Sequence, residues 1–62
     1  MINDKKYITT KELARRWLRS PRTIEGWRVR KTGPNYLDLN GKILYELKEI
    51  IEFENASKVT HD

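Results

Sequence analysis

Basic side chains dominate the chemistry that this sequence offers. The 62-residue chain carries 13 Lys and Arg against nine Asp and Glu, a formal net charge of +4. Residues 1–34 hold ten Lys and Arg and three Asp and Glu, a balance of +7, whereas residues 35–62 hold three and six, a balance of −3. Such a polarised charge indicates a polyanionic partner on one side, although a solvated basic face without a partner has the same composition.

The basic residues divide into two kinds of candidate contact with a nucleic acid. Arginine can donate two parallel hydrogen bonds to a guanine edge, and we expect Arg22 to do so and Arg28 to meet a base or a phosphate. Thr23 fits a phosphate or thymine-methyl contact or local helix capping, and Glu25 fits a cytosine contact or an offset of nearby arginines. Four more basic residues are expected to neutralise phosphates, or else only to keep a small domain soluble: Lys11, Arg15, Arg16 and Arg19.

Gly26 is a further candidate because it falls inside a predicted helix. A glycine there costs about 0.5–1 kcal/mol relative to alanine, so it calls for a reason. Close approach of the helix backbone to a partner's groove is one reason, and neutral drift is the other.

The first element that must position these residues is a helix over about residues 10–18. Thr9 and Glu12 have the spacing of a capping box, in which each side chain satisfies a backbone donor of the other residue. Ile8 and Leu13 have the spacing of the accompanying hydrophobic staple.

A second helix is predicted to begin after Ser20, a good N-cap, with Pro21 at its first position. It should run to about Lys31, because Gly33 favours a C-terminal stop and Pro34 blocks continuation. The connection between the two helices is as short as in a helix-turn-helix.

The second helix has a thin apolar stripe made of Ile24 and Trp27, so most of its surface is expected to be exposed. Trp17 and Trp27 are predicted to be core residues rather than stacking platforms. Four residues are expected on the opposite side, with Arg28 and Arg30 on the flanks: Arg22, Glu25, Gly26 and Val29.

A hairpin and a closing helix are predicted for the rest of the chain. Residues 36–39 and 42–45 flank Asn40-Gly41, a strong signal for a two-residue turn. The pattern leaves open which face of the hairpin is buried. A helix over about residues 46–55 follows, with apolar Leu47, Ile50, Ile51 and Phe53 on one arc and glutamates spaced for solvent. Residues 1–6 and 56–62, with the single histidine His61, are predicted to be flexible ends around one domain of residues 7–55.

Several runs of residues also carry a family resemblance that covers about residues 7–54. They are Tyr7–Ala14, Trp17, the Ser20–Arg28 segment SPRTIEGWR, Gly33–Leu37, Tyr45, Leu47, Ile50 and Phe53. With these runs the chain resembles the small MerR-like excisionase domain, a group that includes the AlpA-type phage regulators. The resemblance implies a mostly α fold with a small β-hairpin, the winged helix-turn-helix in the order α-α-β-β-α.

The resemblance implies a function as well. Family members are DNA-binding proteins of phages and mobile elements, which bend attachment-site DNA to direct an integrase towards excision, or which regulate transcription. For this chain it implies double-stranded DNA, adjacent copies of itself and a tyrosine or serine integrase as partners, in the cytoplasm on the nucleoid of a bacterial host. It also implies that the hairpin tip, with Asn40 and Lys42, lies along the DNA backbone or in a minor groove. An interaction module that binds an integrase without reading DNA is the alternative from another class.

Two departures from the family pattern stand out. The family usually has a glycine and a small aliphatic residue in the turn between the helices, where this chain has Leu18 and Arg19. Leu18 is therefore predicted to adopt an unfavourable backbone conformation, unless the turn is built differently. Asp38 occupies a hairpin position that is commonly basic in relatives, which argues against a strongly charged wing.

Enzymes, cofactor proteins and membrane proteins are not favoured by this composition. The chain has no cysteine, one histidine and no glycine-rich phosphate loop, so we expect no catalysis, no cofactor and no metal. Its longest apolar run, Ile43-Leu44-Tyr45, is too short to cross a bilayer, and the first six residues lack the apolar core of a secretory signal.

Overall fold

The computed structural model describes residues 6–59, and in these residues a capping box begins the first helix as predicted. The Thr9 side chain accepts a hydrogen bond from the Glu12 N–H at 3.2 Å, and the Glu12 carboxylate accepts one from the Thr9 N–H at 2.9 Å. The helix, α1, spans Thr10–Arg16, two residues less than predicted. It ends there because Leu18 takes a positive φ of 57°, which confirms the unfavourable conformation expected for this leucine.

The second helix, α2, spans Pro21–Val29 and also begins as predicted. The Ser20 hydroxyl accepts the Thr23 N–H at 3.2 Å, and Pro21 holds the first helical position. The predicted end at Lys31 is wrong by two residues, since Lys31 has a φ of 58° that no helix continues.

A three-stranded antiparallel sheet replaces the predicted two-stranded hairpin. Strands β2 (Leu37–Leu39) and β3 (Lys42–Glu46) pair in the predicted register about Asn40 and Gly41, whose φ values of 59° and 93° fit a type I′ turn. The additional strand, β1 (Tyr7–Thr9), pairs with β3 and gives the order β1-β3-β2.

The last helix, α3, spans Leu47–Ser57. It begins one residue later than predicted, because Glu46 still belongs to β3. It also includes residues 56 and 57, for which the prediction of a flexible tail is wrong. The predictions for residues 1–5 and for His61 concern residues outside the described range.

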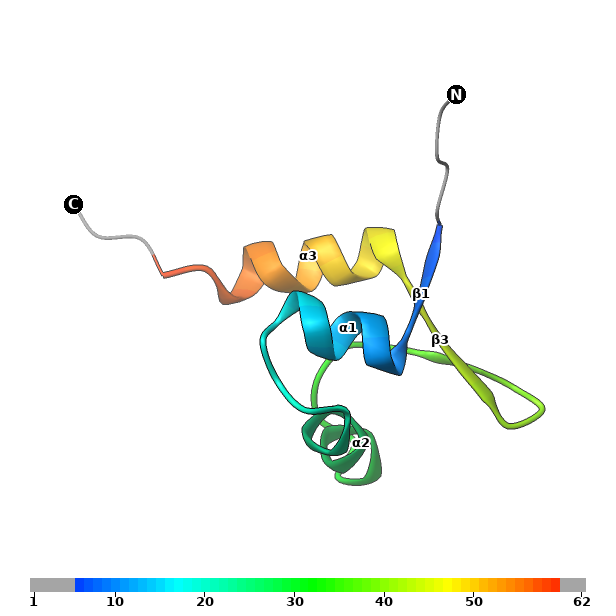
Figure 1. Cartoon of the computed structure of the whole chain (residues 1–62). Helices are drawn as coiled ribbons and strands as arrows, with labels where there is room; N and C mark the ends of the chain where they lie inside the picture. Colours follow the sequence, from blue (N-terminus) through cyan, green and yellow to red (C-terminus); the bar gives the residue numbers. More distant parts are fainter. Residues whose placement is uncertain (1–5, 60–62) are drawn as a thin grey trace.

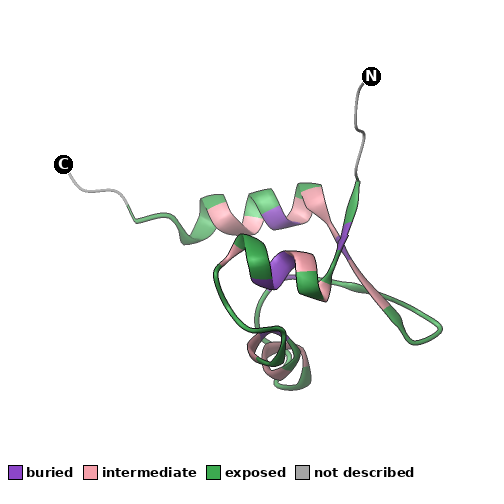
Figure 2. Ribbon diagram, viewed as in Figure 1, coloured by how far each residue is buried: buried purple, intermediate pink, exposed green. Residues whose placement is uncertain are grey.

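One small core joins the sheet to all three helices. In Figure 1, α2 is seen end-on below α1, α3 runs above α1, and the hairpin extends to the side. The core is purple in Figure 2 and consists of Ile8, Leu13, Ala14, Ile24, Tyr45 and Ile50. Ile8 and Tyr45 lie opposite each other in β1 and β3, so their side of the sheet is the buried one.

Three apolar side chains are less buried than predicted. Trp17 and Trp27 are half-buried against the core, where their rings lie 5.9 Å apart, rather than inside it. Ile51, predicted on the apolar arc of α3, is 43% exposed. In the described part of the chain, no helix is both long and apolar enough to cross a membrane.

Candidate nucleic-acid interface

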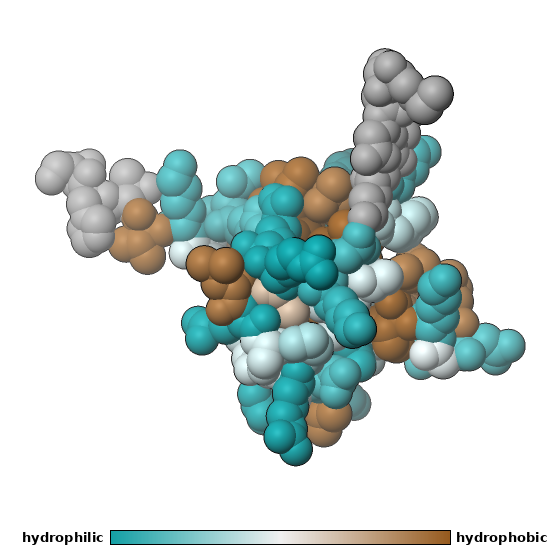
Figure 3. Space-filling view, viewed as in Figure 1, coloured by the Kyte–Doolittle hydropathy of each residue, from teal (hydrophilic) through white to brown (hydrophobic). Residues whose placement is uncertain are grey.

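The exposed side of α2 and its C-cap carries two basic residues, Arg22 and Arg30, that no other element covers. Arg22, Glu25, Val29 and Arg30 are exposed and form what we name the α2 face. Val29, the one apolar member of this face, is 81% exposed. In Figure 3 the surface over α2, at the bottom, is mostly hydrophilic, whereas apolar side chains gather over the hairpin.

Gly26 lies in ordinary helical conformation within α2. Beyond the adjacent residues and the helix's own backbone, the atoms nearest to a Cβ atom added there belong to the Arg30 guanidinium, with Nη1 at 3.4 Å. Because that guanidinium is the far end of a flexible side chain, the protein's own fold does not require glycine at this position.

Thr23 takes part in the N-terminal cap of α2. Its hydroxyl lies 3.1 Å from the Ser20 hydroxyl, and its N–H donates to the same side chain. Of the two roles that the sequence left open for Thr23, local capping is therefore formed in the folded chain. A contact with DNA requires the hydroxyl to rotate or to accept an additional bond.

Arg28 lies between α2, α1 and the sheet rather than on an open flank. Its Nη1 donates to the Thr10 hydroxyl at 3.3 Å and to the Tyr45 hydroxyl at 3.2 Å. Its guanidinium carbon stands 5.6 Å from the centre of the Tyr36 ring, a cation–π arrangement. The side chain thus fixes α2 against β3, which the sequence did not indicate.

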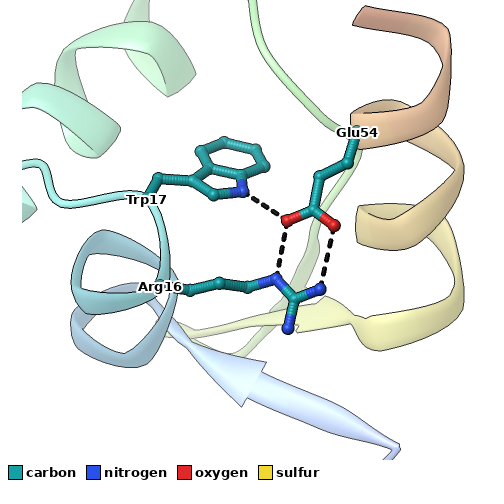
Figure 4. A network of polar contacts seen from close by, with 3 residues as sticks. All are labelled: Arg16, Trp17 and Glu54. Atoms are coloured by element: carbon teal, nitrogen blue, oxygen red, sulfur yellow. Dashed lines mark hydrogen bonds and ion pairs between the residues drawn. The ribbon is translucent and has the colours of Figure 1, made fainter. Parts of the chain in front are cut away.

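Arg16, predicted to bind phosphate, is instead paired with a carboxylate of α3 (Figure 4). Its Nε and Nη2 donate to the two Glu54 oxygens at 2.6 and 2.8 Å, and the Trp17 indole N–H donates to Glu54 at 2.6 Å. The hydrogen bonds from Arg16 and Trp17 lower the pKa of Glu54 to about 2. The hydrogen bond to Glu54 in turn raises the pKa of Arg16. We name these three residues the Arg16–Glu54–Trp17 network.

This network corrects the prediction that the glutamates of the last helix are spaced for solvent. Glu54 is only 30% exposed in its side chain and accepts three hydrogen bonds. Glu49 accepts a hydrogen bond from the Asn35 side chain at 2.9 Å. Two of the acidic groups of α3 therefore belong to the fold.

The remaining predicted contacts are exposed but lie apart from one another. Arg15 lies in the last turn of α1, and Arg19 lies in the turn before α2. Asn40 and Lys42 lie at the hairpin tip. The structure therefore gathers Arg22, Glu25 and Gly26 on one helix and leaves the tip as a second, separate element.

Sequence reasoning did not single out Lys31 or Tyr36. Both line a hollow beside Arg28, where the chain leaves α2 for β2. The left-handed backbone at Lys31 carries no sequence signal, because lysine is not a residue that favours it.

Comparisons with protein-family models, with curated proteins and with solved structures gave no match to this chain.

Proposed function

We propose that this protein is a small winged helix-turn-helix protein that binds double-stranded DNA through the α2 face. The observation that carries the proposal is the contrast in charge pairing. Among the described residues, no carboxylate lies within ion-pair distance of Arg22 or Arg30, whereas Arg16 is paired with Glu54. Unpaired arginines on one exposed helix are the usual means of meeting phosphates and guanine edges.

The dimensions of α2 support insertion into the major groove. An α-helix with its side chains is about 10–12 Å in diameter, which fits the major groove with its width of about 12 Å. Arg22, at the second helical position, lies where a recognition helix meets base edges. The exposed methyl groups of Val29 suit contact with thymine methyls.

The hairpin β2–β3 is proposed as the wing. Its tip residues Asn40 and Lys42 are exposed, and its turn is fixed by the Gly41 N–H, which donates to Asp38 at 2.9 Å. Asp38 therefore has a structural role, because its side-chain oxygen holds the turn that presents Lys42. A wing with one lysine fits a supporting backbone contact rather than the main source of affinity.

A single recognition helix buries roughly 600–1,000 Å² and reads few base pairs, so targeting needs more than one protein on the DNA. We infer that adjacent copies, or an integrase of the tyrosine or serine type, bind beside it. The sequence resemblance favours an excisionase that bends attachment-site DNA and promotes integrase-mediated excision. An AlpA-like transcriptional regulator would use the same α2 face.

The test is a fluorescence-anisotropy titration against a panel of genomic duplexes at several salt concentrations. Arg22→Ala should weaken binding to the preferred site by about 1–3 kcal/mol and reduce the preference among sequences. The matched control, Arg15→Ala, should weaken binding to all duplexes alike. It should also make the salt slope, the slope of the logarithm of affinity against the logarithm of salt concentration, shallower by about 1. Binding that does not depend on salt, or that Arg22→Ala leaves unchanged, would contradict the proposal.

A second measurement separates the two biological roles. Purified protein is added to a recombination assay with an integrase and paired attachment sites, and in parallel to a promoter transcription assay. Stimulation of excision with sharp DNA bending supports the excisionase. A change in transcription without any effect on excision supports the regulator.

A further inference from the structure

A cavity of about 400 Å³ lies where the chain passes from α2 to β2, lined by Arg28 and residues 31–36. It contains two cations, Arg28 and Lys31, and none of the residues lining it is acidic. It is separate from the α2 face, since none of Arg22, Glu25, Val29 and Arg30 lines it. Its chemistry is therefore that of an anion site beside the proposed recognition helix.

Arg28 is the fixed cation of this cavity. It is half-buried, and both of its hydrogen bonds leave from Nη1 to neutral hydroxyl groups. No carboxylate of residues 6–59 forms an ion pair with it, and no acceptor there bonds its Nε or Nη2. A half-buried charge usually has a counter-ion, and the tyrosine ring and hydroxyls around Arg28 supply orientation without neutralising it.

The backbone around the cavity is compatible with an anion. The carbonyl groups of the last turn of α2 would repel one, but hydrogen bonds inside the chain occupy the Trp27 and Arg28 carbonyls. The Thr32 N–H donates to the Trp27 carbonyl at 2.8 Å, and the Lys31 N–H donates to the Arg28 carbonyl at 3.1 Å. In the described part of the chain, the N–H groups of Gly33 and Asn35 donate to no backbone carbonyl.

We propose that this cavity binds a phosphate group, held by Arg28 and Lys31. The proposed source of this phosphate group is the DNA backbone beside the groove that α2 occupies. In that respect the inference rests on the proposed function. Because the N-terminal residues of a recognition helix meet the base edges, the C-terminal end of α2, where the cavity lies, is the end directed towards the flanking backbone. Free inorganic phosphate has the same chemistry, so the test includes both.

The test follows the backbone amides of the full chain by two-dimensional NMR, first with inorganic phosphate and then with a short duplex. Lys31→Asn removes the charge and suits the positive φ at this position, because asparagine tolerates it. Arg30→Gln is the matched control, since it removes a charge one residue away outside the cavity. Arg28→Gln is added only if its thermal unfolding shows a folded protein.

We expect phosphate to shift the amides of residues 31–36. Lys31→Asn should weaken that response roughly fivefold or more, and Arg30→Gln should leave it unchanged. With duplex, the same amides should shift, and Lys31→Asn should make the salt slope shallower by about 1.

Each other outcome has a separate meaning. A response to phosphate in a protein that binds no duplex supports the cavity and overturns the proposed function. Duplex binding that shifts α2 but leaves residues 31–36 unmoved overturns the backbone source. Equal effects of Lys31→Asn and Arg30→Gln on phosphate binding, or no response to phosphate, overturn the cavity as a phosphate site.

Discussion

The two sides of this protein use arginine for different purposes. Where α1 meets α3, Arg16 is paired with a carboxylate that the Trp17 indole also binds. On α2 and its C-cap, Arg22 and Arg30 are exposed and have no ion pair among the described residues. Arg28 is half-buried but is held by hydroxyl groups and a ring.

This contrast shows that the charge count of the basic half overstates what is available to a partner. Arg16 contributes to the balance of +7 in residues 1–34, yet Glu54 of the acidic half neutralises it. The cations left for a partner are those for which the fold provides no acid. Which arginines belong to which group follows from the packing of α3 against α1.

Removing the Glu54 carboxylate, which pairs with Arg16, should have the largest effect on stability. Glu54→Ala should destabilise the fold by about 1–2 kcal/mol, because Arg16 and the Trp17 N–H both lose their acceptor. For a domain of this size, that lowers the melting temperature by roughly 5–15 °C in a circular dichroism melt. Glu52→Ala, at an exposed position of the same helix, is the control. Equal melting temperatures for the two variants would contradict the contrast between the two sides.

Low pH should reproduce part of this loss of stability. The pKa of Glu54 is about 2 in the folded chain against an ordinary value of 4.5. The stabilisation is complete above about pH 4.5 and is lost as the pH falls towards 2, because the unfolded chain binds the proton first. Because the pair is partly exposed, we expect a loss of only about 1 kcal/mol. Urea denaturation at pH 6, 4 and 2.5 measures it, and Glu54→Gln should lack this part of the pH dependence.

The elements that the sequence predicted correctly depend on neighbouring residues. The capping box of α1, the cap of α2 and the Asn40-Gly41 turn each need only residues within four positions of one another. These local signals therefore predict the starts of two helices and the register of the hairpin without any tertiary contact.

The features that were missed depend on distant residues. Strand β1 forms because β3 pairs with it, and three residues such as Tyr7–Thr9 have too little pattern to predict a strand alone. Arg16 and Glu54 are 38 residues apart, so no local pattern pairs them. The helical period predicts that Arg22 lies on the exposed face. The hydrogen bond from the Arg28 side chain to Tyr45 depends instead on where β3 lies.

The turn that joins the two sides offers a smaller effect. Leu18 is 90% exposed with a φ of 57°, so its side chain adds strain and almost no packing. Leu18→Gly should stabilise the fold by about 1 kcal/mol or slightly less, since glycine adopts this conformation freely but gains entropy when unfolded. Leu18→Ala keeps the strain and should change little. Urea denaturation compares the two, and equal midpoints would show that the turn is not strained.

The smallest effect on stability tests the α2 face most directly. Gly26→Ala should stabilise the fold by about 0.5–1 kcal/mol, because the backbone is helical and only the Arg30 side chain lies near the new methyl group. The same change should weaken duplex binding several-fold if the helix backbone approaches the groove closely at this point. A higher melting temperature in thermal unfolding together with a lower duplex affinity in anisotropy titrations would show that Gly26 serves binding rather than the fold.

Arg30→Ala provides the background that tells the two causes of weaker binding apart. If the methyl group acts by displacing the Arg30 guanidinium, 3.4 Å away, Gly26→Ala should no longer affect binding once Arg30 is removed. If it acts by holding the helix away from DNA, the loss should persist in the double variant, because the obstacle is the Cβ atom itself. If Gly26→Ala stabilises the protein and leaves DNA binding as tight as in the parent, α2 contacts DNA through a face other than the one that contains Arg22, Gly26 and Arg30.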